Sequence, residues 1–268
     1  MLCGLGIGLY LDERNTLNHS YVSGNGKAAN RVEVLVTVQQ VDVTNNDLVL
    51  RLMPDPQGTL VAQDGTPTKN LEIDVISENA PELHFEAGQT IVPRTIRASL
   101  EDGTVTDYPF DHYVTLLGFG ASEAGRDVPI EVRLREADPF FLTKVSSRGT
   151  LAGAVFDEVR ISRSRGTLIL AWFMMIAMWA LALSVAGGAY VIVRRRQGVV
   201  WPALGWMAAT LFALIGMRNA APGSPPIGSV IDYAAFFWAE AIVACSLTVV
   251  AVSGIRAEHA AMVRGREP

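Results

Sequence analysis

Three charged side chains in the C-terminal part of the chain are the best placed for chemistry: Arg218, Asp232 and Glu240. The two acids are eight residues apart, so on a helix they lie on nearly the same face. Glu240 lies about two turns inside an apolar stretch. An ionised carboxylate there costs about 2.5–3.5 kcal/mol, so it must face protein, pair with a cation or hold a proton. Arg218 is the natural partner of one acid.

We consider three interpretations of these three residues. In the first, an ion pair fixes the intervening loop. In the second, the residues form a site for a proton or a ligand, and in the third, Glu240 contacts another subunit. The sequence favours the ion pair and leaves the other two open.

A second motif, Asp-Tyr-Pro-Phe-Asp-His-Tyr, occupies residues 107–113. Proline fixes its own φ and biases the preceding residue toward extended geometry, and an aspartate caps its own turn. We interpret the motif as a corner entering a strand, or as an element that docks on membrane helices or on a partner. Neighbours on a strand point to opposite faces, so Asp111 and His112 are poorly placed for joint acid–base catalysis. The candidate domain–membrane junction residues are Tyr108, Pro109, Phe110, Asp111 and Tyr113.

Known catalytic and ligand-binding patterns are missing from the sequence. The four histidines have no zinc-ligand spacing, and the chain has no Walker loop, nucleophile elbow or dinucleotide-binding fingerprint. We therefore predict no catalytic, cofactor-binding or metal-binding residues and no cofactor. An enzyme acting on envelope lipids or glycans stays an alternative, because it would need a cleft with paired acids, which sequence alone does not reveal.

The elements that must position these residues include a membrane region, as the composition indicates. The chain is 50% hydrophobic and 18% charged, with a mean hydropathy of +0.27, and soluble domains typically carry about 25% charged residues. Residues 12–165 contain 23 acidic and 15 basic residues, a net charge of −8, and the rest has a net charge of +3. An acidic polar domain repels phosphate, so nucleic acid is not an expected partner.

Three apolar stretches are long enough to cross a bilayer, which needs about 20 helical residues. We predict transmembrane helices at 166–194, 199–217 and 233–255, a Pro-rich extracytoplasmic loop at 218–232 and a cytoplasmic tail at 256–268.

The apolar residues 1–11 form a shorter stretch. As a helix they reach only about 16 Å, and they lack the basic start and the cleavage site of a signal peptide. We expect a transmembrane helix truncated by a start assigned too late; a half-span among the other helices is the alternative.

Basic residues set the expected orientation. Six arginines lie at 194–196 and in the tail, against four on the opposite side. The C-terminus is therefore expected in the cytoplasm and residues 12–165 outside a plasma membrane.

Residues 12–165 show the period-2 alternation of half-buried strands, separated by turn residues. We predict an α+β membrane protein with an extracytoplasmic all-β domain, an antiparallel Ig-like sandwich, on a helical transmembrane bundle. Both cysteines, Cys3 and Cys245, lie in apolar stretches, so this domain has no internal disulfide. The predicted strands are 31–43, 48–53, 71–76, 90–99, 113–119, 128–135, 140–146 and 154–161.

The motif at 107–113, together with Arg-Asn-Ala-Ala-Pro-Gly-Ser-Pro-Pro-Ile-Gly-Ser-Val-Ile-Asp-Tyr-Ala-Ala-Phe-Phe-Trp-Ala-Glu at 218–240, resembles an uncharacterised membrane-protein family of mycobacteria and other actinobacteria, domain of unknown function 4436. The resemblance implies an N-terminal helix, a β-rich outer region and three C-terminal helices, and it implies no activity. The turn is also similar to one in pentameric ligand-gated channels, but those have four helices after the sandwich and none before it, so the likeness serves as an analogy for docking.

The expected function is a non-enzymatic accessory or scaffold subunit of a cell-envelope complex. The expected partners are the lipid bilayer and either a membrane protein or further copies of the chain. The alternative is a membrane sensor or transport element, in which an outer-domain ligand or protonation of Glu240 alters helix packing.

Overall fold

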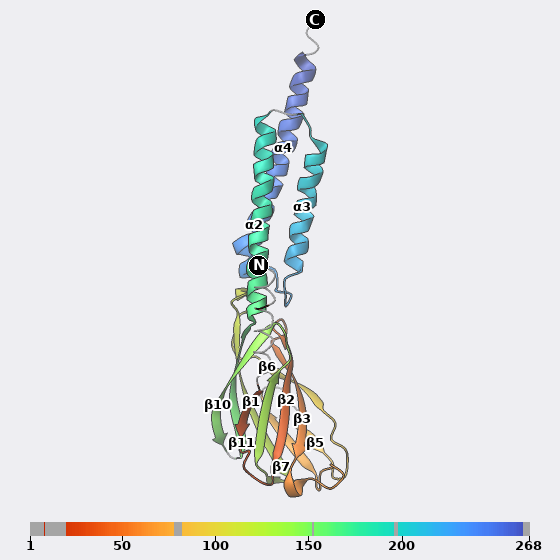
Figure 1. The fold of residues 1–268 in the computed structure, drawn as a ribbon, viewed down its shortest axis with the longest axis vertical. Coiled ribbons are helices and arrows are strands. Elements are labelled where there is room, and N and C mark those ends of the chain that lie inside the picture. Colours follow the sequence, from red (N-terminus) through yellow and green to blue (C-terminus); the bar gives the residue numbers. More distant parts are fainter. Residues whose placement is uncertain (1–7, 9–19, 78–81, 152, 196–197, 265–268) are drawn as a thin grey trace. The chain divides into compact units, whose positions relative to one another are not determined.

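The computed structural model describes residues 8, 20–77, 82–151, 153–195 and 198–264 (Figure 1). The chain divides into two compact units. The β-rich unit comprises Met1–Val105 and Phe110–Gly166, and the helical unit comprises Thr106–Pro109 and Thr167–Pro268. The prediction for residues 1–11 lies, except at Gly8, outside the described residues.

The first sheet has five strands in the order β1-β9-β2-β3-β6. Its long strand β2 alternates as its sequence predicts, with the valines from Val32 to Val38 fully buried and the residues between them only partly so. The strands are β1 (Ser20–Gly24), β2 (Val32–Asp42), β3 (Asp47–Pro56), β6 (Arg94–Ser99) and β9 (Ile130–Glu136).

The second sheet has the order β10-β11-β7-β4-β5, with the short strand β8 paired to β7. Buried side chains of both sheets form one apolar core, in which Leu50 and Val132 of the first sheet join Phe119 and Val159 of the second. The strands are β4 (Leu71–Ile76), β5 (Leu83–Phe85), β7 (His112–Glu123), β8 (Arg126–Asp127), β10 (Phe141–Leu151) and β11 (Ala154–Arg163). Two single turns of 3₁₀ helix, η1 (Gly58–Leu60) and η2 (Val105–Asp107), lie in the connections.

Each of the eight predicted strands overlaps a strand of the structure, and three strands were missed. The missed strands β5 and β8 have three and two residues, too few for a period-2 signal, and the five-residue strand β1 has no buried position. The expectation of a purely antiparallel arrangement was wrong, because β2 and β9 pair in parallel from Val32↔Ile130 to Val38↔Glu136. Alternation within a strand carries no information about the direction of its neighbour.

The helical unit contains three long helices, visible in Figure 1 as α2, α3 and α4. Their apolar faces share one cluster, to which α2 contributes Met178, α3 contributes Met207 and α4 contributes Val243. A π-helix, η3, leads directly into α4. The bounds are α2 (Arg165–Arg194), α3 (Trp201–Asn219), η3 (Asp232–Phe236) and α4 (Phe237–Arg264).

Two of these helical segments, Arg165–Arg194 and Asp232–Val263, are long and apolar enough to span a membrane. α3 is not one of the two; its 19 residues include two tryptophans, a proline and an arginine, which lower its mean hydropathy. Beyond the predicted span at 233–255, α4 continues to Arg264, so the first part of the predicted tail at 256–268 is helical. Its Ala-rich sequence, without Pro or Gly between Arg256 and Arg264, favours continued helix.

Two glycines on the outward side of β7 differ in the space around them. A Cβ at Gly118 would lie 2.8 Å from the Cβ of Ile76 and 2.8 Å from the ring of Phe156. A Cβ at Gly120 would meet its nearest neighbour, the Cβ of Asp74, at an ordinary 3.6 Å. Gly118 is therefore required by the neighbours that cover it, and Gly120 is not.

We predict that Gly118→Ala destabilises the β-rich unit by about 1–3 kcal/mol, because the added methyl group overpacks the sheet surface. The matched control Gly120→Ala should be neutral or slightly stabilising, because glycine within a strand costs about 0.5–1 kcal/mol relative to alanine. Hydrogen exchange of the peptides of β7 and β11, measured by mass spectrometry on the full chain in detergent, gives both values. Equal effects of the two substitutions would show that the crowding at Gly118 is unimportant.

Candidate functional site

Arg218, near the end of α3, and Asp232, at the start of η3, form a buried bidentate ion pair. Arg218 Nε donates to Asp232 Oδ1 at 2.8 Å, and Arg218 Nη2 donates to Asp232 Oδ2 at 2.8 Å. Their side chains are 8% and 0% exposed. Two parallel N–H···O bonds are the strongest arrangement of this pair and fix the geometry of both groups.

The same two side chains hold the loop between α3 and η3. The guanidinium donates to the carbonyl oxygens of Pro225 and Pro226 at 2.9 and 2.7 Å. Asp232 Oδ2 accepts the backbone N–H of Gly228 at 2.7 Å. Because Arg218 and Asp232 satisfy backbone groups of the loop as well as each other, the arrangement serves to fix the loop.

The third member of the predicted trio lies elsewhere. No hydrogen bond or ion pair joins the Glu240 side chain to Arg218, to Asp232 or to any other residue in the part of the chain that the structure describes. Glu240 instead lines a lateral groove between α3 and α4 with a volume of about 520 Å³. The structure thus brings together two of the three residues.

A π-helical turn separates Asp232 from Glu240. The backbone N–H of Phe237 bonds to the carbonyl oxygen of Asp232, five residues earlier. The indole N–H of Trp179 on α2 donates to the carbonyl oxygen of Ala234 at 3.0 Å. This bond attaches α2 to the widened turn, and single π-turns of this kind are frequent at functional sites.

The predicted junction motif is divided between the two units. Tyr108 and Pro109, joined by a cis peptide bond, belong to the helical unit, and Tyr108 is fully buried in its apolar cluster. Phe110, Asp111 and Tyr113 belong to the β-rich unit, in which Phe110 is 53% exposed and the other two are buried.

Asp111 forms a buried ion pair with Arg163 of β11, a residue that sequence analysis missed. Arg163 Nε and Nη2 each donate to the Asp111 carboxylate at 2.9 Å, and the Tyr113 hydroxyl donates to it at 2.8 Å. The guanidinium carbon lies 4.2 Å above the ring centre of Phe141, a cation–π distance. Burial and the bond to Asp111 raise the pKa of Tyr113. The strand alternation could have predicted that Arg163 is buried, because Val159, Ile161 and Arg163 occupy successive inward positions of β11.

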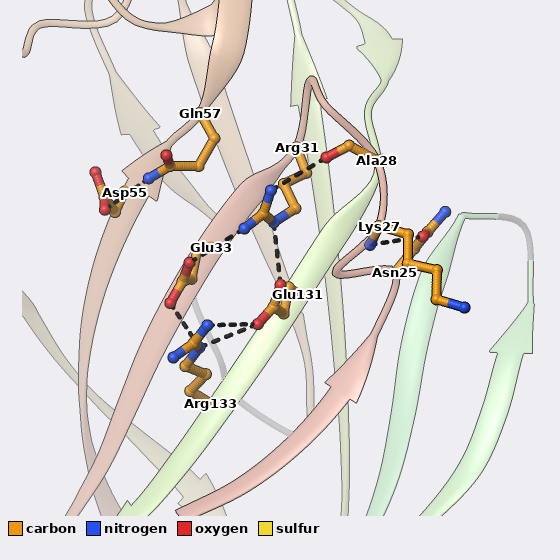
Figure 2. A network of polar contacts seen from close by, with 9 residues as sticks. All are labelled: Asn25, Lys27, Ala28, Arg31, Glu33, Asp55, Gln57, Glu131 and Arg133. Carbon is orange, nitrogen blue, oxygen red and sulfur yellow. Dashed lines mark hydrogen bonds and ion pairs between the residues drawn. The ribbon is translucent and has the colours of Figure 1, made fainter.

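A third set of charges bridges the parallel strands β2 and β9 (Figure 2). Glu33 and Glu131 are direct neighbours across the pair, where two carboxylates repel each other. Arg133 Nε lies 2.6 Å from Glu33, and Arg133 Nη2 lies 2.9 Å from Glu131. Arg31 Nε bonds to Glu131 at 3.0 Å. The sequence could have indicated this network, because a basic and an acidic residue alternate with a valine at both 31–33 and 131–133.

These three charged clusters occur in a chain that two family models cover almost end to end. One family, described as domain of unknown function (DUF4436), matches residues 22–162. The chain belongs to the DUF4436 family. A second family, described as domain of unknown function (DUF8686), matches residues 163–257. No curated protein matches the chain.

The two family matches meet where the fold changes from strands to helices. The DUF4436 match ends one residue before the end of β11, and the DUF8686 match begins two residues before α2. The Asp111–Arg163 and Glu33–Arg133 clusters lie in or at the edge of the DUF4436 part, and the Arg218–Asp232 pair lies in the DUF8686 part.

Among the carboxyl groups of the DUF4436 domain that have no basic partner in the described structure, Glu136 has a strongly raised pKa. Glu136, at the end of β9, accepts hydrogen bonds from the Thr143 hydroxyl and from the backbone N–H of Asp138. Burial, the main cause, and the nearby Asp138 carboxylate together raise the pKa of Glu136 to about 8. Protonated Glu136 is therefore the stable form at neutral pH.

We predict that Arg218→Met destabilises the helical unit by about 3–5 kcal/mol, because it leaves the Asp232 carboxylate buried without a partner. The double variant Arg218→Met/Asp232→Asn should recover part of this loss, since neither charge remains. Thermal unfolding of the full chain in detergent measures both effects. Arg256→Met, at an exposed arginine of α4, is the control, and a loss as large as that of Arg218→Met would refute a specific role of the pair.

We predict that the stability of the β-rich unit falls as pH rises from about 4.5 to about 8. In this window the folded state keeps the proton on Glu136 and the unfolded state has released it, so folding binds a proton. Glu136→Gln should flatten this dependence, and Glu101→Gln, at an exposed site, should not. Melting temperatures of the full chain between pH 5 and 8 provide the measurement, and an unchanged slope in Glu136→Gln would contradict the assignment.

Proposed function

We propose that this DUF4436 protein is a non-enzymatic accessory or scaffold subunit of a cell-envelope complex. One observation carries the proposal. Asp111 of the first motif pairs with Arg163 of β11, Arg218 and Asp232 of the second motif pair with each other, and all four side chains are buried. Acid–base catalysts need access to a substrate, whereas paired buried charges fix a conformation. These residues therefore support a structural role of the two motifs, as expected of a non-enzymatic subunit.

The proposal includes a location. Two helices apolar enough to span a membrane support an integral membrane protein, and we propose α3 as a further span. The arginine bias supports a plasma membrane with a cytoplasmic C-terminus and an extracytoplasmic β-rich unit. Two sheets around a single core support an Ig-like sandwich for that unit.

A second candidate function, a membrane sensor, draws on Glu136. A carboxyl group whose pKa is raised to about 8 changes its charge near neutral pH. A sensor of pH or of an outer ligand would couple that change to helix packing. A sensor is expected to change its conformation between pH 6 and 8. An accessory subunit is expected to keep its conformation in this range and to bind a partner.

The accessory function predicts a discrete protein neighbour in native membranes. A photoreactive residue at Phe110 suits this test, since Phe110 is exposed and Tyr108 of the same motif is buried. We expect crosslinks to one defined membrane protein, identified by mass spectrometry. The same residue at Val22, an exposed position of β1, serves as the control.

Two results would count against the accessory function. Crosslinks from Phe110 to this chain or to lipid alone indicate that the motif has no protein neighbour. Equal capture of the same protein from Val22 indicates contact without specificity.

A further inference from the structure

The groove between α3 and α4 combines an apolar lining with one carboxylate. It is lined by Glu240 and by the apolar residues Ala208, Leu211, Phe212, Ile215, Phe237, Ala241 and Ala244. Phe212 and Phe237 are exposed on the surface of the helical unit. Glu240 is the only charged residue between Tyr233 and Ile255.

Glu240 contrasts with the other described acids of η3 and α4. Asp232 is paired with Arg218, and Glu258 accepts the backbone N–H of Val199 at 3.0 Å. Within residues 20–77, 82–151, 153–195 and 198–264, no hydrogen bond or ion pair satisfies Glu240. Among the three described acids of η3 and α4, Glu240 alone lacks a donor, and it lies in a groove whose other lining residues are apolar.

The position of Glu240 makes this costly in a bilayer. At 1.5 Å per residue, it lies about 12 Å along the helix from Asp232, well inside a hydrocarbon core about 30 Å thick. This step rests on the proposed membrane location of the unit. A carboxylate at that depth requires a cation or a hydrogen-bond donor, and the amines of lipid headgroups remain at the membrane surface.

The lining also favours a helix as the occupant. Three of its residues, Ala208, Ala241 and Ala244, are small, and small side chains let a second helix backbone approach closely in a membrane. A second copy of the chain cannot supply the cation. Arg165 and Arg194 are the first and last residues of α2, Arg256 lies 16 residues beyond Glu240, about 24 Å along the helix, and Arg218 is already paired with Asp232.

We propose that this groove binds a transmembrane helix of a partner protein that carries a lysine or arginine at the depth of Glu240. The cation pairs with the Glu240 carboxylate, and the partner helix covers the apolar lining. The inference deepens the accessory function by stating the chemistry of the partner.

Synthetic transmembrane peptides test this pairing directly. The full chain is reconstituted in phosphatidylcholine vesicles with Leu/Ala peptides flanked by tryptophans, which carry one lysine within the apolar stretch, one lysine at its end, or none. Energy transfer between labelled protein and peptide reports binding. We expect the peptide with the internal lysine to bind about tenfold more tightly than the other two.

Two kinds of variant distinguish the contribution of the Glu240 charge to peptide binding from that of the groove shape. Glu240→Gln should reduce binding of the internal-lysine peptide to the level of the peptide without lysine. Ala208→Leu, inside the groove, should weaken binding, and Ala209→Leu, at the adjacent exposed position outside the lining, should not. Circular dichroism and flotation of each variant with the vesicles show that it is folded and inserted.

Three outcomes would overturn the inference. The first is equal binding of peptides with and without the internal lysine, and the second is lysine-dependent binding that survives Glu240→Gln. The third is energy transfer between copies of the protein that disappears in Glu240→Gln, which would make a second copy the occupant. Failure of the wild-type chain to float with vesicles refutes the membrane location itself, and thus the proposed function, whereas normal flotation without lysine-dependent binding refutes only this inference.

Discussion

The ion pair between Arg218 and Asp232 determines how the chain returns from α3 into η3 and α4. A loop of twelve residues connects Asn219 to Asp232, and its prolines remove backbone donors that would otherwise stabilise it. The guanidinium replaces that missing support by binding two proline carbonyls while the carboxylate binds the N–H of Gly228. Without both charges, the loop would have few internal bonds, and the start of the π-helix at Asp232 would not be fixed.

The β-rich unit also contains a buried arginine that is stabilised by an aspartate. Arg163 occupies an inward position of β11, where an unpaired guanidinium would be very costly. Asp111 neutralises it, Tyr113 binds the same carboxylate, and the ring of Phe141 covers the cation. On the outward side, Arg31 and Arg133 relieve the repulsion between Glu33 and Glu131 that the parallel pairing of β2 and β9 creates. Pairing direction and charge placement are thus coupled in this sheet.

Much of this arrangement could be predicted from local patterns, and the rest depends on pairing between distant segments. Alternation located the long strands, because a half-buried strand repeats every two residues; β4 was predicted with its exact bounds. The parallel partner of β2 and the role of Arg163 depend on tertiary structure. β2 and β9 are about 100 residues apart in the sequence, and Asp111 and Arg163 are about 50 apart, so each pair meets only after folding. In the candidate site, Arg218 and Asp232 were near enough in sequence to be associated, whereas the direction of Glu240 depends on packing between α3 and α4.

Glu136 and Glu240 both lack a basic partner in the described structure, but they differ in the hydrogen-bond donors around them. Glu136 has donors from its own chain, the Thr143 hydroxyl and the N–H of Asp138, and burial favours its proton. Its environment is complete without another molecule. Glu240 has no such donors among the described residues, and its neighbours in the groove are alanine, leucine, isoleucine and phenylalanine. A proton would neutralise its charge but would leave its oxygens without hydrogen-bonding partners in an apolar groove. A partner cation would satisfy the charge and the oxygens together, and the helix carrying that cation would cover the lining as well.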